Sequence, residues 1–567
     1  MRPDGALGET GDEKILLSAY ALLEPAWSLF GAPQLAVGFL VPGCADAYPG
    51  RKDAKDLEND QGPFAMAVRC GERRMCEGVM IRKVEEPMRY DNDAKQMKFE
   101  VLLRVAQLAY AGDLEEKSDS IPYDIIPGRV ARFRCCVYRE REILRERVIL
   151  ARGKHLPTNP DGEGTVTVLP AACEGCPINR FTVTANCQRC MAKKCVAACP
   201  FGAITVTGSG AYIDPAKCKE CGRCAAACPY NAISDTMRPC LRSCPVDAIT
   251  MDENKQASIK YERCIGCGAC TMDCPFGAIS DTSSIVEVIE QLKGKKQVYA
   301  MFAPAIEGQF GTATVGMLKA ALKKLGFDDS FEVALGADAV AQHEAHELKE
   351  AIQTGRKMTT SCCPAFFTMI KKHFPKLIPN ISSTVSPMTA TARYVKYLHP
   401  HALTVFIGPC IAKKQEIQHV KDSADYVITF EELAAMFKAQ NVDPMEMADD
   451  VQDGSVYGKG FAQSGGVSGA VMEVLDEEGF EMPVTCRKCM GAKECKKALI
   501  AMNAGKMPEN IIEGMACPGG CLDGPAAVDT LQKVVKNRSK LLPKADKRTI
   551  TENVLEHGFD KIKMDDL

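Results

Sequence analysis

The sequence predicts a multidomain protein, in which small cysteine-rich α+β domains precede a larger α/β domain. Its 567 residues are enough for three or four domains. The chain contains 29 cysteines, most of them in tight groups, and short runs that end in Cys-Pro repeat between residues 166 and 285. Beyond residue 295, segments with strand character and segments with helical periodicity follow one another.

Charge and hydropathy exclude several classes of function. The formal net charge is −3 and the isoelectric point is about 6.3, so the charge balance predicts no nucleic-acid partner. Residues 15–44 are apolar, but Glu24, Pro25 and Pro33 interrupt them, which predicts a buried helix and a strand instead of a membrane span. No signal peptide is evident, and Cys-x-x-Cys runs ending in Cys-Pro favour metal over disulfides. We therefore expect a cytoplasmic protein of a reducing, anaerobic cell.

Residues 1–165 form an N-terminal domain whose role the sequence does not reveal. Residues 96–111 have the apolar periodicity of a helix. Cys135 and Cys136 have no following proline and no partner motif, so we interpret them as buried thiols, with a cluster or redox role as the alternative. The charged residues 139–147 predict a solvated face of a helix or strand.

The region 166–285 follows a turn-rich linker over residues 157–164. Its three cysteine runs are Cys187, Cys190, Cys195 and Cys199; Cys218, Cys221, Cys224 and Cys228; and Cys264, Cys267, Cys270 and Cys274. The last two have the Cys-x2-Cys-x2-Cys-x3-Cys-Pro spacing of bacterial ferredoxins, in which the fourth cysteine ligates the other cluster. The first run has two extra residues before its third cysteine. The region therefore predicts a ferredoxin-like α+β fold.

The same crossing rule assigns the cluster ligands. In the first unit, Cys228 is the fourth ligand of the cluster bound by the first three cysteines of the first run. Cys199 is the fourth ligand of the cluster bound by the first three cysteines of the second run. A second unit begins at Cys240 and Cys244, and Cys244 joins the first three cysteines of the third run.

One further ligand set has to be completed from outside the runs. Cys240 and Cys274 need two more thiols, which Cys173 and Cys176 can supply. Sixteen cysteines then hold about four [4Fe–4S] clusters. Alternatively, Cys173 and Cys176 are free or bind something else.

The region 295–530 should be an α/β domain. Residues 295–303 and 403–407 predict strands, and residues 337–354 predict a helix that ends near Gly355. Residues 461–467 predict a glycine-rich turn, and the tail from residue 529 onward predicts a helix with a solvated end.

Three motifs in this region carry a family resemblance. They are Thr-Thr-Ser-Cys-Cys-Pro-Ala-Phe at 359–366, Ile-Gly-Pro-Cys-Ile-Ala-Lys-Lys-Gln-Glu at 407–416, and Glu-Gly-Met-Ala-Cys-Pro-Gly-Gly-Cys-Leu-Asp-Gly at 513–524. Together they resemble the signatures of the [FeFe]-hydrogenase catalytic domain, which implies an α/β domain of two lobes around an active-site cluster, with residues 531–567 as a C-terminal tail. Gly408 stands where the family has methionine, and fewer glycines follow the last cysteine. These departures and the Pro-Ala-Phe ending are most similar to the divergent group B branch.

The motifs contain enough thiols for one cubane cluster. Cys363, Cys410, Cys517 and Cys521 come from three segments and match the ligand number of a [4Fe–4S] cluster. The resemblance implies that Cys521 also bridges to a two-iron subsite with CO and cyanide ligands, forming the H-cluster, and that Met515 packs on this cofactor.

Catalytic roles also follow from the resemblance. Cys362 corresponds to the acid–base group beside the open iron, not to a cubane ligand. Lys413 can hydrogen-bond a cyanide ligand, whereas Lys414 is the better candidate for a surface lysine.

A proton route is predicted from helix geometry and from the resemblance. Glu344 and Glu347 are three residues apart, so they are neighbours on one helix face, and burial would raise the pKa of Glu344. Both align with glutamates of the family's proton path, and Ser382 aligns with its serine. The alternative is a solvated charged face.

Cys486, Cys489 and Cys495 have metal-like spacing but no evident fourth ligand. Free thiols and a metal or additional cluster both remain open for them.

The resemblance implies an oxidoreductase of hydrogen metabolism, an iron hydrogenase that oxidises H2 or reduces protons. Its expected partners are a ferredoxin or similar electron carrier and dedicated maturation proteins for the two-iron subsite. Alternatives are a hydrogen sensor, a non-catalytic relative that serves iron–sulfur assembly, and an electron-transfer ferredoxin with an added domain. Cys362 favours turnover over sensing, since sensor relatives often lack it. Lys413 and Glu416 disfavour the assembly role, and the four cubane cysteines disfavour the plain ferredoxin.

Overall fold

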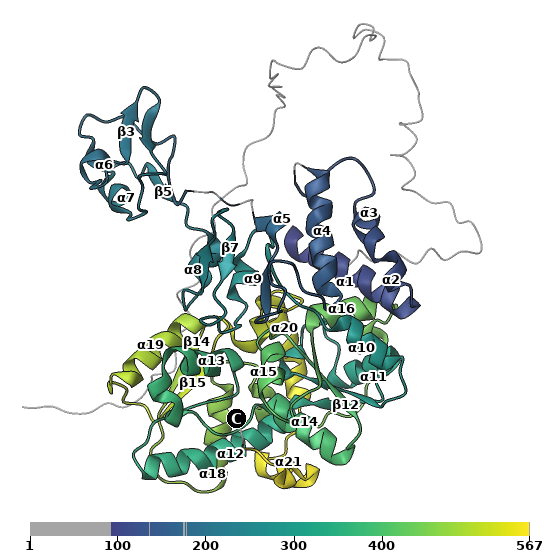
Figure 1. Cartoon of the computed structure of the whole chain (residues 1–567). Coiled ribbons are helices and arrows are strands. Elements are labelled where there is room, and N and C mark those ends of the chain that lie inside the picture. Colours follow the sequence, from purple (N-terminus) through teal and green to yellow (C-terminus); the bar gives the residue numbers. More distant parts are fainter. Residues whose placement is uncertain (1–91, 135, 174–175, 177–178, 566–567) are drawn as a thin grey trace, which may run out of the picture. The chain divides into compact units, whose positions relative to one another are not determined.

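The computed structural model describes residues 92–134, 136–173, 176 and 179–565 (Figure 1). These residues belong to the second of two compact units, 86–567. The elements predicted within residues 15–44, and Cys135, lie outside the described residues. Every described cysteine is a free thiol, and none of the described helices is long and apolar enough to cross a membrane.

The described N-terminal part consists of two long helices, α1 (Asp93–Ala111) and α4 (Val137–Ala151), with the short helices α2 (Leu114–Lys117) and α3 (Ile121–Ile125) between them. The helix predicted from residue 96 is therefore confirmed. It begins at residue 93 because the side chain of Asn92 caps it, accepting a 2.9 Å hydrogen bond from the Lys95 amide. The solvated face predicted for residues 139–147 is wrong in part, because Glu140 and Arg147 of α4 are buried.

The cluster-binding region is built from two-stranded antiparallel sheets and one-turn helices that carry cysteines. Strand β2 (Phe181–Val183) pairs with β5 (Ile233–Asp235), β3 (Ile204–Thr207) with β4 (Gly210–Ile213), β6 (Ile249–Met251) with β7 (Ala257–Ile259), and β1 (Val166–Val168) with β8 (Ile279–Asp281). The short helices are α5 (Pro170–Cys173), α6 (Lys194–Ala197), α7 (Arg223–Ala227), α8 (Pro239–Ser243) and α9 (Ala269–Asp273). This arrangement is the expected α+β fold.

Two separate parallel sheets form the core of the following region. One has the order β10 (Asp329–Glu332), β9 (Val298–Phe302), β12 (Leu403–Gly408), β13 (Tyr426–Thr429), and the other β11 (Met358–Thr359), β15 (Ile511–Met515), β14 (Cys486–Met490). Every residue of β9 and of β15 is buried, as is usual for parallel strands covered on both faces. The predicted strands at 295–303 and 403–407 are confirmed, and the two sheets correspond to the two predicted lobes.

Helices cover both sheets. The longest is α12 (Val333–Gln353), which begins four residues before the predicted helix and contacts α14 (Pro387–Leu398) and α18 (Gly466–Glu477). The other main helices are α10 (Ile285–Leu292), α11 (Val315–Leu325), α13 (Pro364–His373), α15 (Lys413–His419), α16 (Phe430–Ala439), α19 (Ala492–Asn503), α20 (Leu531–Leu541) and α21 (Ile550–His557).

The C-terminal segment packs against this region. Phe559, Ile562 and Met564 are buried in the same apolar cluster as α12, and the Val385 amide donates a 2.7 Å hydrogen bond to the Met564 carbonyl. The predicted solvated end is therefore wrong, because these apolar side chains complete the cover of α12.

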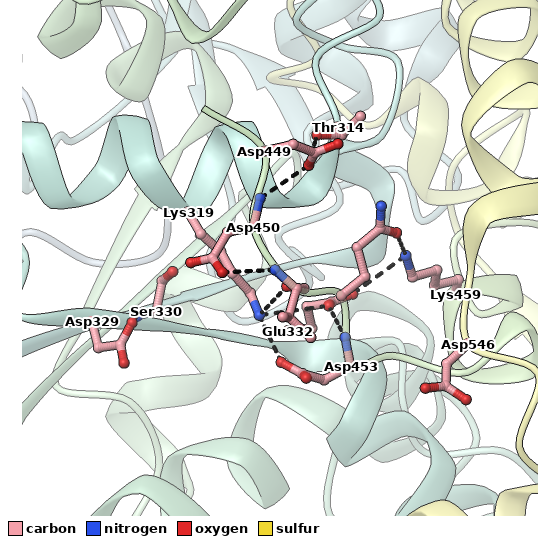
Figure 2. A network of polar contacts seen from close by, with 12 residues as sticks. Thr314, Lys319, Asp329, Ser330, Glu332, Asp449, Asp450, Asp453, Lys459 and Asp546 are labelled. Carbon is pink, nitrogen blue, oxygen red and sulfur yellow. Dashed lines mark hydrogen bonds and ion pairs between the residues drawn. The ribbon is translucent and has the colours of Figure 1, made fainter. Parts of the chain in front are cut away.

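A polar network ties β10 to the loop before α17 (Val456–Gly460) (Figure 2). The Lys319 ammonium lies 2.6 Å from the Asp453 carboxylate, and the Asp453 amide donates a 2.7 Å hydrogen bond to Glu332. Lys459, which is 1% exposed, lies 3.5 Å from Glu332 and 2.9 Å from Glu307. Because Lys319, Lys459, Glu332 and Glu307 each have a partner of opposite sign, these charges can be buried.

A second buried network joins α1 to the region of the two sheets. Lys414 forms ion pairs with Asp281 at 2.7 Å and Glu432 at 3.1 Å, and Lys98 binds Asp281 and Glu431, both at 2.7 Å. Burial would raise the pKa of Asp281, but Lys414 and Lys98 bring it well below its usual value. The prediction that Lys414 lies at the surface is wrong, because its side chain is buried in ion pairs with Asp281 and Glu432.

Asp338 in α12 makes stability depend on pH. It is fully buried, and burial raises its pKa to about 7 despite hydrogen bonds from Ser455 and Asn553. The folded state therefore holds a proton that the unfolded chain releases above about pH 4. Consequently, the free energy of unfolding falls as pH rises from about 4 to 7, by on the order of 4 kcal/mol.

We expect Asp338→Asn to flatten this dependence. Thermal unfolding of the variant at pH 5.5 and pH 8 should differ less than it does for the parent protein. Asp476→Asn on α18, which changes an exposed carboxylate, is the matched control. An unchanged pH dependence in Asp338→Asn would contradict the assignment.

Candidate functional site

The three cysteine motifs meet because each follows a parallel strand. Cys410 comes after β12 of the four-stranded sheet, whereas Cys363 follows β11 and Cys517 follows β15 of the three-stranded sheet. Ligands in parallel α/β sheets bind outside the carboxyl ends of the strands, where these residues lie. A single cavity is lined by residues of all three motifs, among them Cys362, Cys363, Cys410, Lys413, Met515, Cys517 and Cys521.

The cavity is almost entirely apolar apart from these thiols and Lys413. Ala303, Val333, Pro387 and Met388 are among the residues that complete its wall. Burial raises the pKa of Cys410 to about 11 and that of Cys521 to about 12, and the neighbouring thiols contribute in the same direction. Four thiols that line one cavity and whose charges repel one another need a cation to become thiolates, and the iron of a [4Fe–4S] cluster would supply it.

A tight turn brings the last two cysteines together. Gly519 and Gly520 between them both have positive φ, 93° and 71°. A Cβ on Gly520 would lie 3.0 Å from the Ala462 carbonyl, so the backbone can approach only where no side chain is present.

The wall of the cavity differs at Gly408 from what the resemblance leads one to expect. A Cβ there would lie 2.6 Å from the ring of Phe406, which itself lines the cavity. The aromatic ring thus takes the space beside residue 408. Sequence reasoning missed Phe406, although its place two residues before Gly408 on β12 was a usable signal.

Lys413 is fixed at the cavity by buried partners. It is 8% exposed, and its ammonium lies 2.6 Å from the Glu416 carboxylate and 2.7 Å from the Ser386 hydroxyl. It also lies 3.5 Å from the Cys362 carbonyl. A cation held this way can donate a hydrogen bond to a ligand in the cavity. The sequence did not indicate Ser386.

Glu344 connects α12 to the segment that carries Cys362. It is fully buried, and its Oε1 accepts hydrogen bonds from the Ser361 amide at 3.2 Å and the Ser361 hydroxyl at 3.4 Å. Its Oε2 has no partner among the described residues. Burial raises the pKa of Glu344 to about 8, and the pKa of Cys362 is raised by burial and then by Glu344. Both groups therefore hold a proton at neutral pH.

The other predicted members of the route lie next to Glu344. The hydroxyl of Ser382 donates a hydrogen bond to the Glu347 carboxylate, and the Ser383 amide donates another at 2.9 Å. The charge of Glu347 also acts on Glu344, so the two carboxylates are neighbours. The two glutamates and Ser382 thus lie close together, and the alternative of a wholly solvated face is wrong for the buried Glu344.

The accessory cysteines come together in four groups. In the first unit, the charge of Cys228 acts on Cys195, and those of Cys218 and Cys199 act on Cys224. A cavity of the first unit is lined by Cys199, Cys218, Cys221 and Cys224. These neighbours are the ones that the crossing rule assigns.

The second unit contains the other two groups. Cys244, Cys264, Cys267 and Cys270 line one cavity. Burial, together with the charges of Cys274, Cys176 and Cys173, raises the pKa of Cys240 to about 11. These four thiols are therefore also neighbours. Cys267 is near enough to Cys363 of the main cavity for the two charges to interact. Cys270 is in the same way near Cys240. The two groups of the second unit therefore form a continuous series that reaches the main cavity.

Cys486, Cys489 and Cys495 do not form such a group. Cys486 and Cys489 lie on β14, and residues three apart in a strand point to opposite faces. Accordingly, Cys486 packs against the apolar cluster around α12, whereas Cys489 and Cys495 belong to another cluster. The free-thiol interpretation fits this geometry, because two cysteines on opposite faces of a strand cannot bind the same metal.

Single metal ions and [4Fe–4S] clusters need different distances between their ligands. In the described part of the chain, no three His, Cys, Asp or Glu side chains converge as a ligand set for one metal ion. A [4Fe–4S] cluster is larger, and each of its thiolates binds a different iron, so its ligands stand further apart.

Removing Cys240 should remove one accessory cluster. We expect Cys240→Ser to lower the iron content of the anaerobically reconstituted protein by about four per chain. Cys489→Ser, a change of another buried cysteine that has no assigned cluster, is the control. If both variants retain the iron of the parent protein, the ligand set of Cys173, Cys176, Cys240 and Cys274 is wrong.

Comparisons with known proteins match the same regions. The model of the iron-only hydrogenase large subunit, C-terminal domain, matches residues 296–525. A 4Fe-4S dicluster domain matches residues 186–232, and the LdpA Fe-S cluster-binding domain matches residues 234–285.

The individual relatives include both hydrogenases and an iron–sulfur cluster assembly factor. The large subunit of the periplasmic [Fe] hydrogenase of Nitratidesulfovibrio vulgaris is 32% identical over 329 residues, which cover 47% of this chain and 78% of that protein. A probable cytosolic Fe-S cluster assembly factor, oxy-4 of Caenorhabditis elegans, is 23% identical and covers 31% of this chain and 50% of its own length. Among solved structures, a variant of the [FeFe]-hydrogenase HydA1 from Chlamydomonas reinhardtii aligns with a TM-score of 0.43 at 23% identity, over 49% of this chain and 94% of that one.

Proposed function

The chain belongs to the iron-only hydrogenase family, and from this premise we propose that it catalyses the reversible oxidation of H2 to protons and electrons. The observation that carries the proposal is the cavity that four thiols line together with Cys362 and Lys413. The four thiols are Cys363, Cys410, Cys517 and Cys521, and they would hold the cubane of an H-cluster. When bound, the two-iron subsite of that cofactor supplies the open metal site for hydrogen chemistry.

The protein residues supply the proton. Cys362 lines the cavity as a protonated thiol and exchanges its proton with Glu344 through the Ser361 contact. Ser382 and Glu347 continue this route away from the cavity. General acid–base catalysis of this kind typically contributes a factor of about 10²–10⁴ in rate.

Other residues orient the cofactor and keep water out. Lys413, held by Glu416 and Ser386, offers a fixed donor to a cyanide ligand. Met515 and Phe406 contribute apolar wall that limits access of solvent. The cysteine groups provide the electron path, with a ferredoxin-type carrier as the proposed partner and maturation proteins as the proposed source of the two-iron subsite.

An iron–sulfur assembly role is the second candidate, because assembly factors are among the relatives. The presence of Cys362, and of Lys413 paired with Glu416 at the cavity, favours the hydrogenase, since neither is required to hold a cubane. We propose the cytoplasm as the location, because reduced thiols remain available there for clusters.

Infrared spectroscopy of the anaerobically matured protein tests the proposal. Bands in the CO and cyanide stretching region, together with hydrogen turnover, are expected. Bands without turnover would favour a sensor. Accessory clusters without these bands would favour the assembly role and overturn the proposed function. Protein isolated without maturation proteins is the control, and fractionation of producing cells tests the location.

A further inference from the structure

Two buried arginines stand out because, among the described residues, no carboxylate lies within ion-pairing distance of them. Seven Lys and Arg side chains are buried in the described part of the chain, and five of these have a carboxylate within 4 Å. The remaining two are Arg147 and Arg238, which are 5% and 7% exposed. Within the described residues, Arg147 Nε and Arg238 Nη1 also lack any hydrogen-bond acceptor. The charges of Glu431 and Cys274 act on Arg147 from beyond ion-pairing distance. A buried cation without a close counter-charge is costly, so an anion beside either arginine would be stabilised there.

Both arginines lie beside the same four thiols. Arg147 of α4 donates a 2.6 Å hydrogen bond to the Gly277 carbonyl and lines one cavity together with Gly277 and Cys274. Arg238 directly precedes α8, the helix that contains Cys240. Its guanidinium is near enough to Cys173 and Cys176 for its charge to act on both thiols. The two guanidinium groups therefore come from different segments of the chain but act on one group of cysteines.

We propose that Arg147 and Arg238 are the counter-charges of a thiolate-bound [4Fe–4S] cluster held by Cys173, Cys176, Cys240 and Cys274, and that they raise its reduction potential. A cubane with four thiolate ligands is an anion, and its one-electron reduction adds a further negative charge without a proton. Two nearby fixed cations in a buried site stabilise that added charge. The inference rests on the accessory ligand set of the proposed function, but not on the H-cluster.

The proposal gives the N-terminal helices a role. Arg147 projects from α4, so this helix belongs to the environment of the cluster as well as to the domain before it. The same four thiols stand next to the group of Cys244, Cys264, Cys267 and Cys270, which in turn adjoins Cys363. A cluster made easier to reduce at this point of the series would retain electrons one step before the main cavity.

Potentiometric titration followed by electron paramagnetic resonance tests the proposal, with dithionite as the reductant and the complete chain carrying its clusters. Cys240→Ser identifies the signal of this cluster by its loss. Arg147→Gln and Arg238→Gln should each shift the midpoint potential of that signal downward. We expect about a tenfold change in the reduction equilibrium for each, which is about 59 mV for one electron. The signals of the first unit should stay unchanged.

The control is Arg145→Gln on the same helix, where the side chain is 44% exposed and pairs with Glu142. No shift in either buried variant, or an equal shift in Arg145→Gln, would overturn the proposal. If Arg147→Gln fails to retain the cluster, Arg147→Lys decides the matter. Retention of the cluster by the lysine variant supports a requirement for charge, whereas loss in both variants indicates a purely structural contact and overturns the assignment for Arg147. Because the CO and cyanide bands are read separately, a failed hydrogenase assignment would not be mistaken for failure here.

Discussion

Replacing Cys362 with alanine should leave the cofactor assembled while removing nearly all hydrogen turnover. Cys363, not Cys362, is the proposed cubane ligand, so the infrared bands should remain. The loss should reach about 10²-fold or more, because Cys362 is the group that connects Glu344 to the cavity. Turnover and infrared spectra of the same preparation measure the two effects.

Two substitutions at the same position refine this test. Serine should rescue poorly, since a hydroxyl is a much weaker acid than a thiol with a pKa of ~8.5. Aspartate should restore part of the turnover, because it can exchange a proton at a similar reach. Retention of most activity by Cys362→Ala would show that the proton route is wrong, and loss of its CO and cyanide bands would show that the ligand assignment is wrong.

Replacing Cys363 with alanine should abolish cofactor binding at the main cavity. Cys363 precedes α13 and lines the cavity with the other three thiols, so its loss removes one of four ligands. We expect the variant to lack the CO and cyanide bands and to contain about six irons fewer per chain, corresponding to the cubane and its two-iron subsite.

The control for this variant is Cys495→Ala. Cys495 is fully buried and near enough to Cys363 for the charge of Cys363 to raise its pKa, but it does not line the cavity. Its removal should lower stability by a cavity effect without loss of the bands. Intact bands in Cys363→Ala, or equal loss in both variants, would contradict the ligand role.

Local sequence determined the parts of the site that depend on spacing. The Cys-x2-Cys-x2-Cys-x3-Cys-Pro runs fix a loop and a one-turn helix around each group, so the neighbours of Cys224 and Cys264 could be predicted before any fold was known. Helical periodicity likewise identified α1 and most of α12, because apolar positions three and four residues apart must share a face.

Interactions between distant segments were decided by tertiary structure alone. Lys413 and Lys414 are adjacent in sequence, but one pairs with Glu416 at the cavity and the other with Asp281 from the cluster-binding region. The spacing of Cys486 and Cys489 is typical of a metal site, but both lie on strand β14, where their side chains point to opposite faces. Arg147 lay in a charged run predicted to be solvated, and only the packing of α4 against the cluster-binding region shows that it is buried. A one-dimensional pattern records which side chains share a local face, whereas burial and charge pairing depend on which segments fold against that face.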